Sequence, residues 1–217
     1  GCVRPDTSLK RILVDGKKDP PRVIGVETAE GEQIGARHFI ASGLNPQQTF
    51  LELLDASLLP APWRQAASEF RYNLLAPLFG LYLNLDSPPR YAAAQQAEHL
   101  HDAFMVILGL ESPADFDAMV LAHEQEQIPP TVMWGSCPTV FDPSQAPAGQ
   151  HTAFMWEKVP YHLHGDASTW DVYGKTHGEQ MLDTWSRYAP GLQGQVLDHF
   201  VRTAADIPRH LPNMQDG

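Results

Sequence analysis

The chain has 217 residues, of which 43% are hydrophobic and 19% charged, and a formal net charge of -11. These values are typical of a globular protein that is long enough to bury a core, and they argue against disorder. The acidic balance argues against a nucleic-acid partner, because clustered lysines and arginines must meet a phosphate backbone. The sequence lacks an apolar run of about 18 residues, so it predicts no membrane span.

Three short strands are predicted at the start of the chain. Residues 9–14 and 22–28 are rich in β-branched side chains, and residues 15–21 between them have the composition of a turn. Glu30-Gly31 supplies a second tight turn, after which residues 33–41 are expected to form the third strand. The pattern indicates a three-stranded antiparallel meander.

After Asn45-Pro46 the spacing of apolar residues becomes helical. The elements expected from there on are short helices around 50–54 and over 63–71, a strand over 78–85, a helix from the N-cap Ser112 to Gln127, strands over 131–136 and 152–159, and helices over 170–188 and 192–201. The predicted fold class is α+β, an antiparallel β-meander followed by a mixed sheet-and-helix body.

Two cysteines, Cys2 and Cys137, lie far apart and form no C-x-x-C pair. Their spacing predicts neither a disulfide framework nor a thiolate metal site, and a reduced, cytoplasmic setting is the corresponding expectation. The chain begins without Met and without a signal-peptide pattern, which leads us to expect a piece of a longer protein.

The run His162-Leu163-His164-Gly165-Asp166 is the most suggestive chemical cluster. H-x-H-x-D resembles the metal-binding run of the metallo-β-lactamase-like hydrolases, lactonases among them, in which imidazoles and carboxylates hold zinc. That family continues with a further His where this chain has Ala167, and it follows a βαβ-type front that is not found here. The primary expectation is therefore a polar loop without a metal, with a site at His162, His164 and Asp166 as the alternative.

The sequence contains no other catalytic constellation. His123 begins an H-E-x-x-H pattern that ends in Gln127, and a G-x-S-x-G elbow is absent. Neither G-x-G-x-x-G nor a Walker A sequence occurs, so these residues provide no ordinary cradle for the phosphates of a dinucleotide. Catalytic residues are accordingly left unassigned.

Aromatic and methionine side chains concentrate in the second half of the chain. The aromatic residues are Trp134, Phe154, Trp156, Tyr161, Trp170, Tyr173, Trp185 and Tyr188, and the methionines with them are Met105, Met119, Met133, Met155 and Met181. Most are expected in the core, but such side chains also line adaptable apolar pockets. A binding face for a hydrophobic substrate is the second interpretation.

Several short segments occur in an order that is more specific than any one of them. They are V-x-G-V-x-x-x-x-G from Val23 to Gly31, I-x-A-x-x-x-I-A-S from Ile34 to Ser42, Asn45-Pro46, T-F-x-x-L-L from Thr49 to Leu54, FDPSQAP from Phe141 to Pro147 with Gly149 and His151, Trp170, YAPGL from Tyr188 to Leu192, and Thr203 through Ile207. In this order they resemble the phytoene-desaturase-like FAD-dependent oxidoreductases, flavoproteins of the amine-oxidase and phytoene-dehydrogenase type.

The resemblance implies that the chain is the middle portion of such an enzyme. Residues 1–46 would be the terminal strands of an FAD-binding domain, residues 47–201 a substrate-binding-type domain, and residues 202–217 the start of a segment that returns to the FAD domain. Ala41, Ser42 and Gly43 would bind the cofactor, since small residues let the backbone approach the FAD closely. Hydride chemistry belongs to the cofactor, so the resemblance assigns no catalytic residue.

The expected function is therefore that of a fragment of an FAD-dependent oxidoreductase, of the dehydrogenase or desaturase type, that acts on an apolar small molecule. The fragment is not expected to bind FAD or to be redox-competent by itself, because the phosphate cradle is missing from these residues. The alternatives are a metal-dependent hydrolase such as a lactonase and a non-catalytic domain that binds apolar ligands. The sequence predicts neither the substrate nor the oligomeric state.

Overall fold

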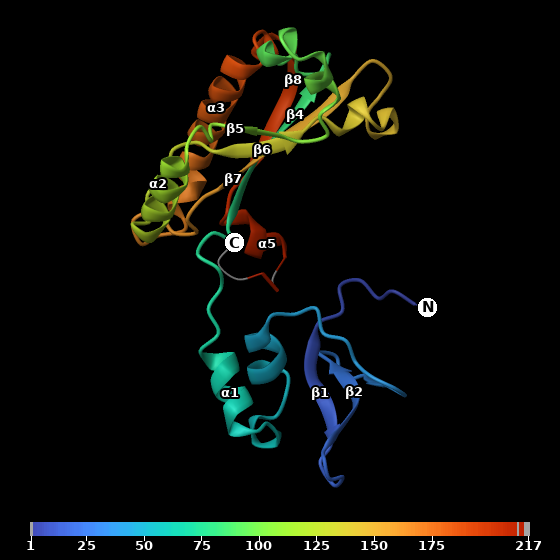
Figure 1. The fold of residues 1–217 in the computed structure, drawn as a ribbon. Coiled ribbons are helices and arrows are strands. Elements are labelled where there is room, and N and C mark those ends of the chain that lie inside the picture. The colour runs from blue at the N-terminus through green and yellow to red at the C-terminus, as the bar shows by residue number, and fades with distance from the viewer. Residues whose placement is uncertain (1, 212, 215–217) are drawn as a thin grey trace. The chain divides into compact units, whose positions relative to one another are not determined.

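The computed structural model describes residues 2–211, 213 and 214, which form two compact units (Figure 1). The first unit contains residues 2–72 with 213 and 214, and the second contains residues 73–211. The units divide after Tyr72, later than the boundary at residue 46 that the resemblance implies, because the helices up to Ser68 pack within the first unit. None of the helices described is both long enough and apolar enough to cross a bilayer.

The first unit contains the predicted antiparallel meander, in the order β1 (Leu9–Asp15), β2 (Arg22–Thr28) and β3 (Gln33–Gly35). The expected extension of the third strand to Ala41 is wrong, since β3 ends at Gly35. The Ala36 N–H still donates to the Ile24 carbonyl at 2.8 Å, and the partner strand begins only two residues further back, at Arg22, after Pro20-Pro21, which have no N–H with which to extend a ladder. Residues 36–43 consequently form a loop.

Two short helices complete the first unit. A π-helix spans Gln48–Glu52, the 3-10 turn Ala56–Leu58 follows it, and α1 spans Ala61–Ser68. The Asn45 side chain accepts a hydrogen bond from the Gln48 N–H at 2.8 Å, which fixes the start of the π-helix. The predicted change to helical structure after Asn45-Pro46 is confirmed.

The second unit is built on a five-stranded antiparallel sheet in the order β5-β6-β7-β4-β8. The strands are β4 (Leu78–Leu85), β5 (Val106–Leu108), β6 (Met133–Ser136), β7 (His151–Lys158) and β8 (Val196–Arg202). The central pair, β4 and β7, is in register along its whole length, from Leu78 opposite Lys158 to Leu85 opposite His151.

The helices of the second unit are α2 (Pro113–Glu124), α3 (Thr169–Tyr188), α4 (Leu192–Gln195) and α5 (Asp206–His210), with 3-10 turns at Ala92–Gln95, Glu98–Asp102, Pro138–Val140 and Pro143–Gln145. The predicted start of α2 is confirmed: the Ser112 N–H donates to the Asp115 carboxylate at 2.6 Å. The helix predicted over 192–201 is wrong beyond Gln195, because the following residues pair with β4 as the edge strand β8. Pairing with a neighbouring strand there overrides the local spacing.

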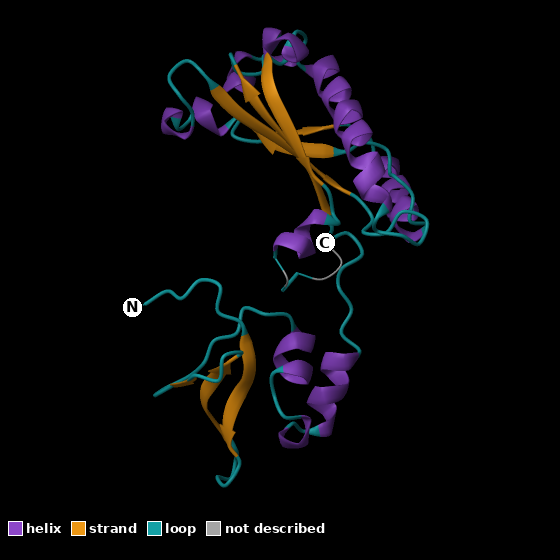
Figure 2. Cartoon of the chain, turned by 180° about the vertical axis from the view of Figure 1, so that it is seen from behind, coloured by secondary structure: helices purple, strands orange, loops and turns teal. Residues whose placement is uncertain are grey.

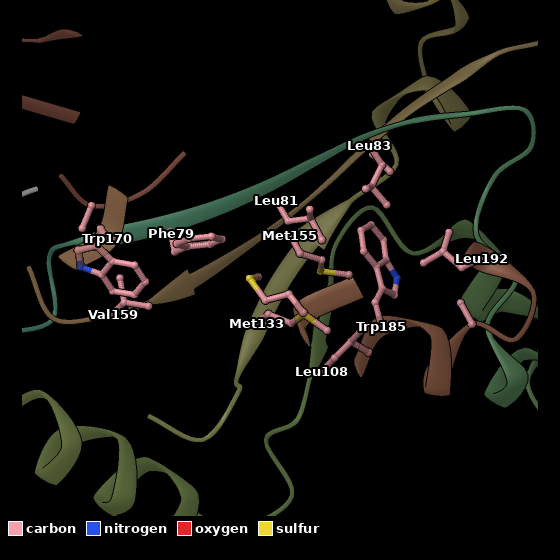
Figure 3. Close-up of a cluster of buried hydrophobic side chains, with 14 of the residues drawn as sticks. Phe79, Leu81, Leu83, Leu108, Met133, Met155, Val159, Trp170, Trp185 and Leu192 are labelled. Carbon is pink, nitrogen blue, oxygen red and sulfur yellow. The ribbon is translucent and has the colours of Figure 1, made fainter. Parts of the chain in front are cut away.

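The helix α3 lies along one face of this sheet (Figure 2) and closes the core of the unit. Phe79, Leu81 and Leu83 of β4 point toward Trp170 and Trp185 of α3, together with Met133 and Met155 of the neighbouring strands (Figure 3). All seven side chains are at most 2% exposed. Burial of this many large side chains on a single face is the main source of stability in the unit.

Two glycines set how closely α3 approaches the sheet. A Cβ at Gly174 would lie 2.6 Å from the Thr203 methyl group, and a Cβ at Gly178 would collide with the Val201 side chain. Glycine inside a helix costs about 1 kcal/mol relative to alanine. The two residues lie one helical turn apart on the same face. Close packing of the helix on the sheet therefore explains why both positions are glycine.

Replacing Gly178 by Leu is therefore expected to lower the free energy of unfolding by about 1 to 3 kcal/mol, since the new side chain must displace Val201. Urea denaturation followed by circular dichroism measures the effect. Gly194→Leu is the matched control, because a Cβ at Gly194 of α4 has no neighbour within 4 Å among the described atoms. Equal stability of the two variants would contradict the role given to Gly178.

Candidate functional site

The face of the five-stranded sheet opposite α3 carries aromatic side chains from four strands. Residues directly opposite each other on paired strands share a face, and the register pairs Trp134 with Trp156 and Phe154 with Tyr82, which is in turn opposite Phe200. We call these five residues the aromatic face. Gly80, between Trp156 and Arg202 in the register, leaves room for the Tyr82 ring, because a Cβ there would lie 2.6 Å from it.

The rings of the aromatic face support one another. Tyr82 and Phe200 stack with their centroids 4.7 Å apart and an interplanar angle of 8°, and Phe154 and Trp156 are also 4.7 Å apart. Trp134 meets the edge of Trp156 at 6.5 Å. Such contacts hold the rings in fixed orientations and make the surface rigid.

One hydrogen bond joins two residues of the aromatic face. The Trp156 indole N–H donates to the Tyr82 hydroxyl at 3.1 Å, and Lys158 Nζ lies 5.6 Å from the centroid of Trp134. Phe200 is still 51% exposed, and the other four rings are half-buried. A surface formed by several contacting aromatic rings is suited to a hydrophobic ligand.

The predicted cofactor-binding residues Ala41, Ser42 and Gly43 line a pocket of about 430 Å³ within the first unit. The remaining lining residues come from β1, β2, the loop before β1 and the π-helix: Thr7, Ser8, Leu9, Ile12, Val26, Ile40, Leu44, Gln48, Glu52 and Leu53. This volume lies within the range of about 300 to 1,000 Å³ that is usual for small-molecule pockets. The structure therefore brings the predicted residues to a site of suitable size.

The loop that carries these residues is held by hydrogen bonds within the first unit. The hydroxyl oxygens of Ser42 and Thr49 lie 2.8 Å apart, and the Asn213 side chain donates to the Gly43 carbonyl at 3.4 Å. The Asn45 side chain donates to the Asn213 carbonyl at 3.1 Å. Asn213 thus fastens both sides of the loop.

Gly43 leaves the pocket open. A Cβ at this position would meet no described atom within 4 Å, and Gly43 does not have a positive φ. The backbone does not itself require glycine here, so the missing side chain keeps space free for a ligand. No Lys or Arg is among the described residues that line the pocket. The lining is mostly apolar and small polar residues, with Glu52 as its one charged member among the described residues.

The residues of the alternative metal site do not assemble into one. The described residues contain no group of three or more His, Cys, Asp or Glu that could hold a metal ion. Asp166 instead accepts hydrogen bonds from the Ser168 N–H and hydroxyl, each at 2.8 Å, which lower its pKa. His162 Nδ1 lies 3.9 Å from the Glu126 carboxylate, and His164 has a left-handed backbone with φ 53°. The segment is a polar turn that leads into α3.

The structure separates the predicted aromatic cluster into two groups. Trp170 and Trp185 of α3 are fully buried between the helix and the sheet. Trp134, Phe154 and Trp156 lie instead on the aromatic face. Sequence reasoning missed Tyr82 and Phe200, the other two members. The alternation of LFGLYLNL could have identified Tyr82, because it places this side chain on the other face of the strand from Leu81 and Leu83. Phe200 could not have been identified, because residues 192–201 were predicted to form a helix.

The opposite face of the sheet contains a buried ionisable pair that sequence reasoning also missed. His177 Nε2 of α3 lies 2.7 Å from the Glu157 carboxylate of β7, and both side chains are at most 1% exposed. Phe79, Trp170 and Tyr173 surround the imidazole. Burial raises the pKa of Glu157, and hydrogen bonding to His177 offsets part of this effect. The pair is enclosed in the core and serves packing, which leaves the aromatic face as the accessible side.

Comparison with known proteins points to oxidoreductases. No family model matches the chain. The rat (Rattus norvegicus) protein named pyridine nucleotide-disulfide oxidoreductase domain-containing protein 2 is 28% identical over 200 residues, which cover 87% of this chain and 33% of that protein. The crystal structure of an oxidoreductase from Methanosarcina mazei matches with a TM-score of 0.50 and 16% identity, over 91% of this chain and 37% of the other.

The second of these likenesses shows a shared fold, and the first shows similarity to a protein named as an oxidoreductase. The chain spans about a third of the length of each. The general class of oxidoreductase that the sequence indicated is thus supported, whereas neither name specifies FAD or a phytoene-type substrate.

The Glu157–His177 pair predicts a pH-dependent stability. Because burial raises the folded-state pKa of Glu157 above its ordinary value of 4.5, the folded protein holds this proton more tightly than the unfolded chain does. The resulting stabilisation is complete below pH 4.5 and is lost as the pH rises through the folded-state pKa, at up to about 1.4 kcal/mol per pH unit.

Urea denaturation of the wild type and of Glu157→Gln, at a series of pH values from acidic to mildly alkaline, measures this effect. The stability of the wild type relative to the variant is expected to fall as the pH rises. An increase with pH would contradict the prediction, because it would mean that the folded protein favours the ionised carboxylate.

Proposed function

We propose that this chain is part of an FAD-dependent oxidoreductase of the phytoene-desaturase-like type, which transfers hydrogen between an apolar small molecule and the flavin. The observation that carries the proposal is the aromatic face: a sheet surface of contacting rings in which the Trp156 N–H is bonded to the Tyr82 hydroxyl. The similarity to proteins named as oxidoreductases supports the reaction class. A cytoplasmic location remains a prediction.

Ala41, Ser42 and Gly43 are the residues that would lie against the flavin ring. Their pocket offers backbone and small side chains, and Gly43 leaves space that a larger residue would fill. When bound, the flavin supplies the acceptor or donor of a hydride. The pocket-lining residues described here bring no Lys or Arg, so we assign no residue of this pocket to the phosphates.

The aromatic face has a different role in the proposal. Its rings would hold an apolar substrate and exclude water from it. No residue on the face is assigned a proton transfer. Specificity for a hydrocarbon over a polar analogue follows, because a polar group would lose its hydrogen bonds to water without replacement.

A non-catalytic domain that binds apolar ligands is the second candidate, since the aromatic face serves it equally well. The two candidates differ in the first unit. The enzyme requires a flavin beside Gly43, whereas the binding domain leaves that pocket unrelated to any redox group. Flavin binding by the intact protein therefore separates them.

The substitution Gly43→Val tests the flavin pocket. The side chain would enter the space reserved for the ring, so we expect the intact protein to bind FAD at least about tenfold more weakly, as a clash of roughly 1.4 kcal/mol would produce. The matched control is Gly35→Val on β3, where a Cβ would have only the Ile24 carbonyl oxygen nearby, at 3.9 Å. Fluorescence titration of the apoprotein with FAD measures the affinity, and thermal unfolding checks the fold.

Unchanged FAD affinity in Gly43→Val would remove these residues from the flavin site. If the intact protein binds no FAD at all, the oxidoreductase proposal fails and the binding domain is favoured.

The substitution Trp156→Gln tests the aromatic face. Trp156 contacts three other residues of the face, so its loss opens the surface to water and is expected to weaken binding of the neutral apolar dye Nile red by roughly tenfold. Trp63→Gln, which removes a 60%-exposed tryptophan from the first unit, is the control. An equal effect of both substitutions would show that the dye does not select the aromatic face.

A further inference from the structure

A second apolar pocket of about 430 Å³ lies within the second unit, at the outer edge of the sheet. Its walls come from the edge strand β5, the residues before it, the 3-10 turns at Ala92–Gln95 and Glu98–Asp102, and the last turn of α3. None of the five residues of the aromatic face lines it. The pocket therefore has walls of its own, and it borders the aromatic face at Ile107, which lies opposite Trp134 in the register.

The wall of this pocket is apolar and adaptable. Alanines supply much of the surface, and the larger side chains include Met105, Ile107 and Leu100. Met105 and Ile107 are 45% and 63% exposed, so both side chains are accessible to a ligand. Methionine conforms to ligands of irregular shape, and an exposed apolar lining of this kind indicates that an apolar partner covers it.

Arg187 places a single positive charge at the pocket. It is the one charged residue among the described residues that line it, and its side chain is exposed. Within the described part of the chain it forms no hydrogen bond or ion pair, although the protein as a whole is strongly acidic. An arginine guanidinium matches the geometry of a carboxylate, to which it can donate two parallel hydrogen bonds.

The other polar groups of the pocket do not compete for such an anion. Trp185 Nε1 donates to the Tyr91 hydroxyl at 3.3 Å, so that hydroxyl already has a partner. Burial raises the pKa of Tyr91 to about 12, which keeps its hydroxyl neutral at physiological pH. Negative charge from the wall itself is therefore absent where a ligand carboxylate would approach Arg187.

We propose that this pocket binds a fatty acid, with the alkyl chain against β5 and the alanine-rich turns and the carboxylate on Arg187. The combination of an apolar cavity with one unpaired arginine at its wall selects a molecule that has a long apolar body and a single acidic end. The position of Arg187 in the last turn of α3 also suits a cation at a helix C-terminus. An experiment on Arg187 must therefore distinguish ligand binding from a contribution of this charge to the stability of α3.

Calorimetric titration of the intact protein with laurate and with its alcohol, dodecanol, each below its aggregation limit, tests the proposal. The wild type is expected to bind laurate roughly fivefold more tightly than dodecanol, because only laurate can pair with Arg187. Arg187→Gln is expected to remove this difference and leave the affinity for dodecanol unchanged. Lys175→Gln, on an exposed position of the same helix, removes the same charge away from the pocket and is expected to change neither affinity.

Filling the cavity provides an independent arm of the test. Ala103→Phe places a ring where the alkyl chain would lie, and we expect it to weaken binding of both ligands at least tenfold. Unchanged binding in this variant would overturn the proposal, because the ligands would then occupy another surface such as the aromatic face. Equal affinity of the wild type for laurate and dodecanol would overturn the role of Arg187. Both outcomes are independent of flavin binding, so they do not depend on the proposed oxidoreductase function.

Discussion

The close packing of α3 against a single face of the five-stranded sheet is the constraint on which the second unit depends. Gly174 and Gly178 remove the side chains that would hold the helix away from β8 and β4, and Trp170 and Trp185 then fill the space along its length. A large antiparallel sheet commonly buries one face and leaves the other free. Here the free face carries aromatic side chains in place of the polar ones that solvent would favour.

This division of the sheet explains why ionisable and apolar groups lie where they do. The Glu157–His177 pair is enclosed under α3, where no solvent reaches it and packing fixes its geometry. The aromatic face lies on the same strands, whose side chains alternate between the two faces of the sheet. It is rigid because the buried face is rigid. The packed core on one side of β4 and β7 therefore fixes the positions of the side chains that a ligand would contact on the other side.

Much of this fold could be predicted from the sequence, because strong local signals agreed with the tertiary structure. The strand Leu78–Leu85 and the capping box at Ser112 are local signals that the structure confirms. The signals failed where tertiary pairing decides the outcome. Residues 196–202 form an edge strand only because β4 offers its free edge, and residues 36–41 leave the sheet near the point where the partner strand β2 begins, at Arg22.

The candidate sites were predictable to different degrees for the same reason. Ala41, Ser42 and Gly43 were carried over from the resemblance to flavoproteins, and the structure places them on one pocket. The aromatic face needs the register of four strands, which no single segment encodes. The pocket beside Arg187 combines residues from positions 91 to 108 with the end of α3, so it exists only after the chain has folded.

The distribution of tryptophans has an optical consequence. Trp170 and Trp185 are shielded from water, whereas Trp134 and Trp156 lie at the surface that a ligand would cover. The second unit thus contains two spectroscopically distinct pairs of indoles, one reporting on the integrity of the core and the other on occupancy of the free face. A ligand that covers the free face would exclude water from the surface pair and shift its emission, while the buried pair keeps its blue-shifted emission until the core unfolds, so that binding and unfolding can be told apart in one spectrum.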